Sequence, residues 1–225
     1  MKLDFYFIHG WGFDKTFWEP VCKKIKGNEF TRVAKSIDLG FFSRDLFDNY
    51  IQKYHSKSIF VVHSYGLNWL LKNQIKCSTI INFFGVPSFL GFQKNPHVTK
   101  KKINRMIENF SENPQGVLND FYNKCNIEYI VNKKANVVRC LKSLKELKDN
   151  DFTKSFNNLS CQVYSIFSLG DNVIKLNKKN LNILRNKNHD IKFVNGIDHG
   201  FPRNNPELCY KMIKKILIEL GYESI

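Results

Sequence analysis

The feature that most constrains the fold of this chain is a series of short, continuous apolar segments. They lie at residues 3–8, 31–37, 58–62, 78–86, 162–169 and 191–196. Several are rich in β-branched and aromatic residues and stop abruptly at glycine or polar loops, as buried strands do. Strands that are apolar on both faces and separated by helices are typical of a parallel sheet covered on both sides. We therefore predict an α/β fold with a mostly parallel sheet of about six strands.

Helical spacing of apolar residues marks the segments between these strands. The expected helices lie at residues 14–26, 45–54, 67–74 and 206–220. In the first of them, Phe17, Val21 and Ile25 are four residues apart and follow Asp14, which can cap the helix. A chain of 225 residues fits one globular domain better than two. The helices are therefore expected to cover both faces of a single sheet.

The strand pattern disappears between residues 87 and 151. Three amphipathic stretches replace it, at residues 99–110, 114–125 and 136–149, and they are strongly basic. A long helical insertion between two strands is expected to form a lid over the carboxyl ends of the strands. We thus predict a core made of residues 1–86 and 152–225, with a helical lid subdomain at residues 87–151.

The strongest chemical signal is the sequence Val-His-Ser-Tyr-Gly at residues 62–66, between an expected strand and an expected helix. A sharp strand-to-helix turn of this kind presents a nucleophilic serine, here Ser64. The residues two positions away must be small, which Gly66 satisfies and Val62 does not. Taken alone, the motif also fits an ordinary turn.

Serine is a weak nucleophile near neutral pH and needs a base that a carboxylate orients. In α/β sheets with such a turn, the chain order is serine, acid, histidine. Asp171 follows the strand at 162–169 and His199 follows the strand at 191–196, so both are expected at the same sheet edge as Ser64. We predict the triad Ser64, Asp171 and His199. Asp198 is the competing acid, although a neighbour of the histidine has difficulty reaching its ring.

Ester hydrolysis passes through an oxyanion, which needs backbone N–H donors held in place. The sequence His-Gly-Trp-Gly at residues 9–12 follows the first strand. We predict that the N–H groups of Trp11 and Tyr65 form this oxyanion hole. A glycine-rich turn around a buried tryptophan is the alternative. His9 and His63 are expected to pack locally, while His55, His97 and His189 are expected to be solvated.

Composition limits the partners and cofactors. The six cysteines are scattered without a CxxC pair, which favours free thiols in a reducing compartment and no metal site. The net charge of +15 favours an acidic partner, although a general bias of the chain toward lysine explains it equally well. No nucleic-acid-binding motif accompanies the basic residues. No apolar stretch approaches the roughly 18 residues that cross a bilayer, so a cytoplasmic protein without membrane contact is expected.

Four motifs together resemble the α/β-hydrolase superfamily: residues 9–12, 63–66, 170–174 and 198–202. More narrowly, Trp18 and the stretches 109–122 and 144–171 are similar to the pimeloyl-acyl-carrier-protein methyl ester esterases of biotin biosynthesis. The resemblance implies an α/β-hydrolase fold and hydrolysis of a methyl ester on a pimeloyl chain, with release of methanol and no cofactor. It implies acyl-carrier protein, which is acidic, as the partner of a monomeric enzyme. Trp11 and the lid residues Arg139 and Lys142 are then the expected substrate-binding residues.

Three other functions remain open at this stage. An acyl-carrier thioesterase or a generic short-chain carboxylesterase would use the same Ser64. A hydrolase-like protein without catalytic activity that binds an acidic partner is a further alternative, which Val62 and the basic charge suggest.

Overall fold

The computed structural model describes residues 2–43, 58–129, 131, 133–184 and 188–222 and contains a six-stranded sheet, parallel throughout. Its strands are β1 (Leu3–Ile8), β2 (Thr31–Ile37), β3 (Ser58–His63), β4 (Thr79–Phe83), β5 (Gln162–Phe167) and β6 (His189–Phe193). They lie in the order β2-β1-β3-β4-β5-β6. The predicted α/β architecture and strand number are confirmed. The central strands β3 and β4 are buried along their whole length, which explains why both read as continuous apolar runs.

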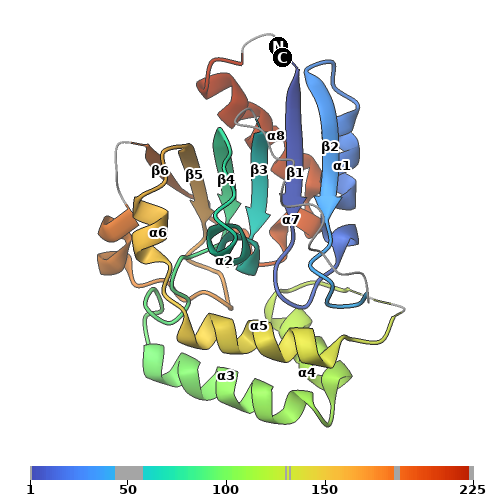
Figure 1. Cartoon of the computed structure of the whole chain (residues 1–225), viewed down its shortest axis with the longest axis vertical. Coiled ribbons are helices and arrows are strands. Elements are labelled where there is room, and N and C mark those ends of the chain that lie inside the picture. The colour runs from blue at the N-terminus through green and yellow to red at the C-terminus, as the bar shows by residue number, and fades with distance from the viewer. Residues whose placement is uncertain (1, 44–57, 130, 132, 185–187, 223–225) are drawn as a thin grey trace.

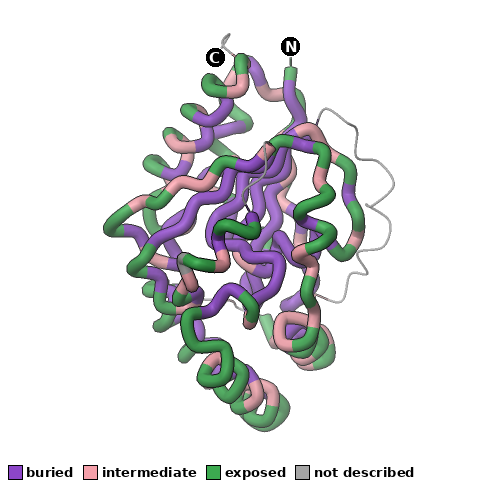
Figure 2. The backbone as a smooth tube through the Cα atoms, turned by 90° about the vertical axis from the view of Figure 1, so that its left-hand side faces the viewer, coloured by how far each residue is buried: buried purple, intermediate pink, exposed green. Residues whose placement is uncertain are grey.

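Helices cover both faces of the sheet (Figure 1). They are η1 (Lys15–Trp18), α1 (Glu19–Lys26), α2 (Tyr65–Lys72), α6 (Thr153–Asn157), η4 (Lys178–Leu184), α7 (Phe201–Asn204) and α8 (Pro206–Glu219). In the view of Figure 1, α1 and α8 pack together behind the sheet, and α2 and α6 lie in front of it. Figure 2 shows the result as buried strands inside a layer of half-exposed helices. Among the described residues, every helix is too short or too polar to cross a lipid bilayer.

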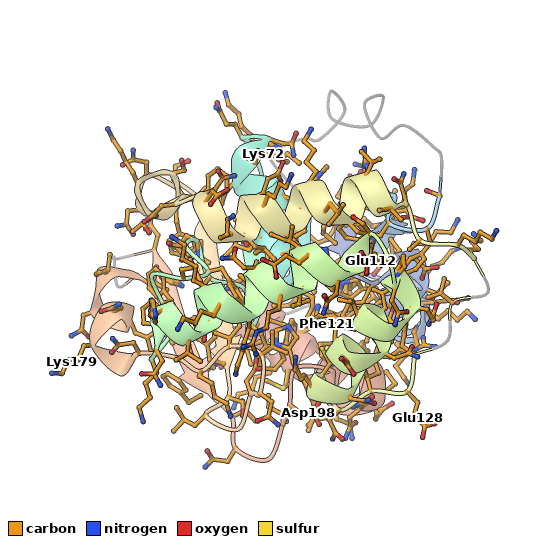
Figure 3. All side chains as sticks on the ribbon, turned by 90° about the horizontal axis from the view of Figure 1, so that it is seen from below. Lys72, Glu112, Phe121, Glu128, Lys179 and Asp198 are labelled. Atoms are coloured by element: carbon orange, nitrogen blue, oxygen red, sulfur yellow. The ribbon has the colours of Figure 1, made fainter. Side chains whose placement is uncertain are left out.

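Three helices interrupt the chain between β4 and β5: α3 (Pro96–Phe110), α4 (Pro114–Lys124) and α5 (Val137–Asp149). They lie beyond the ends to which the strand arrows point in Figure 1, which are the carboxyl ends. Seen from below, α3 and α5 run side by side across this edge of the sheet (Figure 3). We refer to residues 87–151, which contain these helices, as the lid.

Some predicted boundaries differ from the structure. The first helix begins as a 3₁₀ turn because the side chain of Asp14 accepts the N–H of Thr16, and the α-helix starts only at Glu19, ahead of Pro20. The last strand begins at His189, two residues earlier than its apolar pattern indicates, because the edge strand β6 is only partly buried. The helix expected at 45–54 lies outside the described residues.

Candidate active site

Ser64 occupies the turn between β3 and α2 and has backbone angles of φ 51° and ψ −119°. A residue with a Cβ adopts a positive φ at a cost in free energy, and such strain is characteristic of a nucleophile held above a sheet. Gly66 allows the turn to pack, because a Cβ there would lie 2.8 Å from the carbonyl oxygen of Ile8. The Ser64 side chain is partly exposed, whereas the residues on both sides of it are buried.

Val62 departs from the glycine that the motif usually carries, and the structure shows why valine fits. Val62 lies within β3, where it pairs with Ile8 on one side and Asn82 on the other. The φ angle of Val62 is not positive; among residues 58–72, only Ser64 has a positive φ. The side chain is fully buried in the core. Valine is therefore an ordinary strand residue at this position and leaves the turn intact.

Asp171 and His199 are joined directly. Nδ1 of His199 lies 2.7 Å from Oδ2 of Asp171, and both side chains are buried. The other carboxylate oxygen, Oδ1, accepts the backbone N–H groups of Val173 at 2.7 Å and Ile174 at 2.9 Å. These two bonds prevent the carboxylate from rotating. Asp171 thus holds the imidazole in one orientation and favours the tautomer with its proton on Nδ1.

The second ring nitrogen of His199, Nε2, is buried and has no hydrogen-bond partner among the described residues. The ring lies against Phe84, with centroids 5.5 Å apart, and against His63, at 4.8 Å. His63 is the chain neighbour of Ser64, and its Nε2 lies 2.9 Å from the carbonyl oxygen of His199. No hydrogen bond joins this nitrogen to Ser64 in the described part of the chain, so a transfer of the Ser64 proton to it requires the hydroxyl to turn toward the ring.

Asp198, the competing candidate for the acid, binds a residue of the lid. Its Oδ2 accepts the side-chain amide of Asn126 at 2.6 Å. Asn126 follows α4, so Asp198 connects the loop that carries His199 to the lid. The N–H of Gly200 donates to the carbonyl oxygen of Cys125 at 2.8 Å and makes a second connection. In the view of Figure 3, which looks onto the lid, the label of Asp198 lies below that of Phe121 of α4.

Replacing Gly200 with alanine is expected to lower kcat at least tenfold. An alanine Cβ would lie 2.7 Å from the carbonyl oxygen of Cys125 and 3.0 Å from Cβ of Ile127, which forces His199 and the lid apart. Displacing a catalytic group by about 1 Å can cost 100-fold in rate. Gly170→Ala is the matched control, because its Cβ beside Asp171 would meet nothing closer than 3.5 Å. Equal activity of the two variants in a steady-state ester assay would contradict the expectation.

The two expected oxyanion donors are held in place by bonds to α5. Nε1 of Trp11 donates to the carbonyl oxygen of Cys140 at 3.0 Å, and the hydroxyl of Tyr65 donates to Oε2 of Glu146 at 2.7 Å. Within the described part of the chain, the backbone N–H groups of Trp11 and Tyr65 have no acceptor. Because Tyr65 is the first residue of α2, its N–H also lies at the positive end of a helix. These two N–H groups are the candidate oxyanion donors.

A cavity of about 750 Å³ connects Ser64 and Trp11 with the inner side of the lid. Apolar side chains from all three lid helices line it: Ile103, Met106, Phe121, Leu144 and Leu147. Phe89 and Val173 complete the apolar wall. Three exposed lysines also line the cavity: Lys102, Lys124 and Lys175. Asp120 adds one carboxylate to the lining of this largely apolar space.

Arg139 and Lys142, the two expected substrate-binding cations, do not line this cavity. Nη1 of Arg139 donates to the carbonyl oxygen of Leu39 at 2.7 Å, so the guanidinium connects α5 to the loop after β2. Lys142 is exposed on α5 and lines separate surface hollows, one of which it shares with Arg139 and with Tyr65, the chain neighbour of Ser64. Sequence reasoning missed Lys175 as a cavity residue, because its place follows from the folding of the Asp171 loop against the lid.

Of the other histidines, His97 is exposed, as expected, and His55 lies outside the described residues, whereas His9 and His189 are buried in the core. His9 is buried and accepts the N–H of Leu39 at Nε2, 2.9 Å away. His189 is also buried, so the expectation that it is solvated is wrong. Its Nε2 lies 2.9 Å from Oγ of Ser165, and Nδ1 contacts the carbonyl oxygen of Leu184. Polar neighbours in the sequence do not reveal that the first residue of β6 faces a pocket of the core.

The free energy of unfolding is expected to fall as the pH drops from 7.5 to 5.5. Burial lowers the pKa of His63 well below 6.5, and the nearby His199 adds to this effect; burial also lowers the pKa of His189. The unfolded chain therefore binds protons below pH 6.5 that the folded protein does not bind, and stability is lost. Each histidine contributes at most about 1.4 kcal/mol per pH unit. Urea unfolding at several pH values between 7.5 and 5.5 measures how the free energy of unfolding changes with pH. A free energy that stays constant over this range would contradict the prediction.

The described residues contain no group of three or more histidine, cysteine or acidic side chains placed to hold a metal ion. All six cysteines are free thiols. Ser64, His199, Asp171 and the backbone N–H groups of Trp11 and Tyr65 are the candidate groups for the chemistry of this site.

Comparison by sequence alone matches the chain to no family model and to no curated protein. Comparison of structures does find similar proteins. An esterase from Exiguobacterium antarcticum has a TM-score of 0.78 at 14% identity, over 96% of this chain and 92% of that one. A bromoperoxidase from Bacillus anthracis has a TM-score of 0.73 at 13% identity, over 96% and 92%. MenH from S. aureus has a TM-score of 0.70 at 16% identity, over 97% and 94%.

These likenesses extend over nearly the whole of each chain, lid included. At such low identity they show the fold, and that fold is the α/β-hydrolase fold. What the site does has to be argued from its own residues.

Proposed function

We propose that this protein is a serine carboxylesterase with Ser64 as nucleophile, His199 as general base and Asp171 as the residue that orients the base. The observation that carries the proposal is the 2.7 Å bond between His199 and a doubly anchored Asp171, beside a serine in a strained turn. Ser64 also lines an apolar cavity large enough for an acyl chain. This cavity favours an ester of a fatty-acid-like chain as the substrate.

In the proposed reaction, Oγ of Ser64 forms a bond to the ester carbonyl carbon while its proton passes to Nε2 of His199. The N–H groups of Trp11 and Tyr65 stabilise the negative charge on the carbonyl oxygen. The C–O bond to the alcohol then breaks, and the alcohol leaves with the proton from Nε2. A water molecule, deprotonated by the same nitrogen, hydrolyses the acyl-serine and restores Ser64.

We further propose that the ester is the methyl ester of a pimeloyl chain carried by acyl-carrier protein. The resemblance of residues 109–122 and 144–171 to esterases of that kind supports this substrate. The three lysines of the cavity support an acidic carrier, and so does the net charge of +15. Arg139 and Lys142 lie outside the cavity and would contact the surface of the carrier, whereas the cavity lysines would lie near the tethered chain.

Charge reversal at the cavity tests the role of the lysines. Lys102→Glu and Lys124→Glu are each expected to raise the KM for the carrier-bound methyl ester about tenfold at low salt, with little change in kcat. The KM for free dimethyl pimelate should change less than twofold, since that ester carries no charge. Lys215→Glu on α8 is the control, because this lysine is exposed and lies outside the cavity. Equal effects on both substrates would count against a carrier.

Mass spectrometry of the products distinguishes the remaining alternatives. Methyl ester cleavage leaves the chain on the carrier and removes one CH₂ unit from its mass. A thioesterase would instead release the acyl chain and leave the free carrier thiol. A short-chain carboxylesterase would hydrolyse free methyl esters as fast as the carrier-bound one.

A further inference from the structure

Two cysteines lie close together at the edge of the sheet opposite Ser64. Cys77 precedes β4 and Cys161 directly precedes β5, and these strands are neighbours in the sheet. Their Sγ atoms are 3.8 Å apart. Among the six cysteines, all of which lie in the described part of the chain, these two alone have sulfur atoms in contact with each other. The candidate triad does not use them.

The surrounding backbone holds this pair together. The N–H of Gln162 donates to the carbonyl oxygen of Ser78 at 3.2 Å, and Thr79 pairs with Gln162 in the sheet. A disulfide has an S–S length of about 2.05 Å, so the sulfur atoms have to approach by less than 2 Å. Rotation of the two side chains about their Cα–Cβ bonds is the movement that the disulfide requires.

We propose that Cys77 and Cys161 form a modification site, at which a hydroperoxide oxidises the two thiols to a disulfide. Cys161 is the attacking thiol and Cys77 the resolving thiol. The thiol of Cys77 donates a hydrogen bond to Sγ of Cys161, which lowers the pKa of Cys161 and favours the thiolate that reacts with peroxides. Cys161 is buried but keeps 9% of its surface exposed, and its neighbour Cys77 is partly exposed, so a small hydroperoxide reaches the pair from the side of Cys77.

The reaction balances with one peroxide molecule. The Cys161 thiolate attacks one oxygen of hydrogen peroxide, the O–O bond breaks, and a sulfenic acid and hydroxide form. Sγ of Cys77 then attacks the sulfenic sulfur, an S–S bond forms and the S–O bond breaks, so that a second hydroxide leaves. The two protons of the thiols neutralise the two hydroxides. Two thiols and one peroxide thus give one disulfide and two water molecules.

The other four cysteines are poorly suited to this chemistry. Cys125, Cys140 and Cys209 are completely buried, and burial raises the pKa of each. Cys22 is partly exposed, but burial raises its pKa as well, and it has no neighbouring thiol. Cys22 is therefore a matched control for exposure without a partner.

The disulfide would close a loop that contains β4 and the entire lid. Such a bond lowers the entropy of the unfolded chain and so stabilises the folded protein. The carboxyl ends of β4 and β5, where the site lies, would be unaffected. We therefore expect a more stable protein with unchanged site geometry.

The test is treatment of the purified protein with hydrogen peroxide, followed by non-reducing peptide mapping. We expect a Cys77–Cys161 linked peptide and a rise in Tm of about 10 °C, both reversed by dithiothreitol. Cys161→Ser should abolish both effects, whereas Cys22→Ser should leave them unchanged. In Cys77→Ser, a dimedone adduct should accumulate on Cys161.

Three results would overturn the proposal. They are two free thiols after complete treatment, oxidation of either cysteine to a sulfinic acid without linkage, or a linked peptide that joins other cysteines. Because peptide mapping of the unaltered protein decides the outcome, a variant that folds poorly does not prevent the test.

Discussion

Replacing Ser64 with alanine is expected to lower kcat for ester hydrolysis by a factor of about 10⁴ or more. Without Oγ, no acyl-enzyme forms, and only binding and the oxyanion donors remain to accelerate attack by water. The same change should abolish covalent labelling by a fluorophosphonate, which reacts with activated serines alone. Labelling of the unaltered protein, and its loss in the variant, is measured by intact mass.

Folding is expected to survive this substitution. Ser64 is partly exposed, and alanine at this φ is strained to the same extent as serine. Ser160→Ala, at an exposed serine beyond the sheet, is the control and should retain full activity. If the unaltered protein is not labelled, the catalytic interpretation fails and the alternative of a non-catalytic binding protein gains support.

Asp171→Asn is expected to lower kcat by a factor of about 10⁴ near neutral pH, because it reverses the His199 tautomer. The N–H groups of Val173 and Ile174 both donate to Oδ1, so the carbonyl oxygen of the new amide must take that position. Its NH₂ group then faces Nδ1 of His199 and donates to it. The imidazole proton is driven to Nε2, which can no longer accept the proton of Ser64.

Asp198→Asn is the matched control for this prediction. It removes one charge next to His199 and disturbs the bond to Asn126, but it leaves the tautomer alone. A loss of less than tenfold in kcat is expected. If Asp198→Asn lost more activity than Asp171→Asn, Asp198 would be the orienting acid and the bond between Asp171 and His199 would be structural.

The lid is bonded to each element of the candidate site. Trp11 is held by the carbonyl oxygen of Cys140, Tyr65 by Glu146, and the loop of His199 by the contact between Gly200 and Cys125. The oxyanion loop, the nucleophile turn and the base thus all depend on α4 and α5 for their positions. Substitutions in the lid that loosen these bonds should change kcat and not only substrate binding.

Much of the fold follows from local pattern. Strands such as β3 and β4 are buried on both faces, so their sequences are continuously apolar and end where the chain leaves the core. Because all strands are parallel, their carboxyl ends share one edge, and the loops after β3, β5 and β6 had to meet there. Residues 64, 171 and 199 could therefore be placed together without any measured distance. The edge strand β6 was less well bounded, because partial burial weakens the pattern.

What the sequence by itself determined is the class of fold, the lid insertion and the candidates for nucleophile, acid and base, because these depend on periodicity within one segment and on chain order. Only the tertiary structure showed the bond between Asp171 and His199, put Lys175 and not Arg139 at the cavity, and brought Cys77 to Cys161. Each of these depends on a contact between segments far apart in the chain. Such contacts depend on how helices and loops pack together, and the pattern of residues within one segment does not predict that packing.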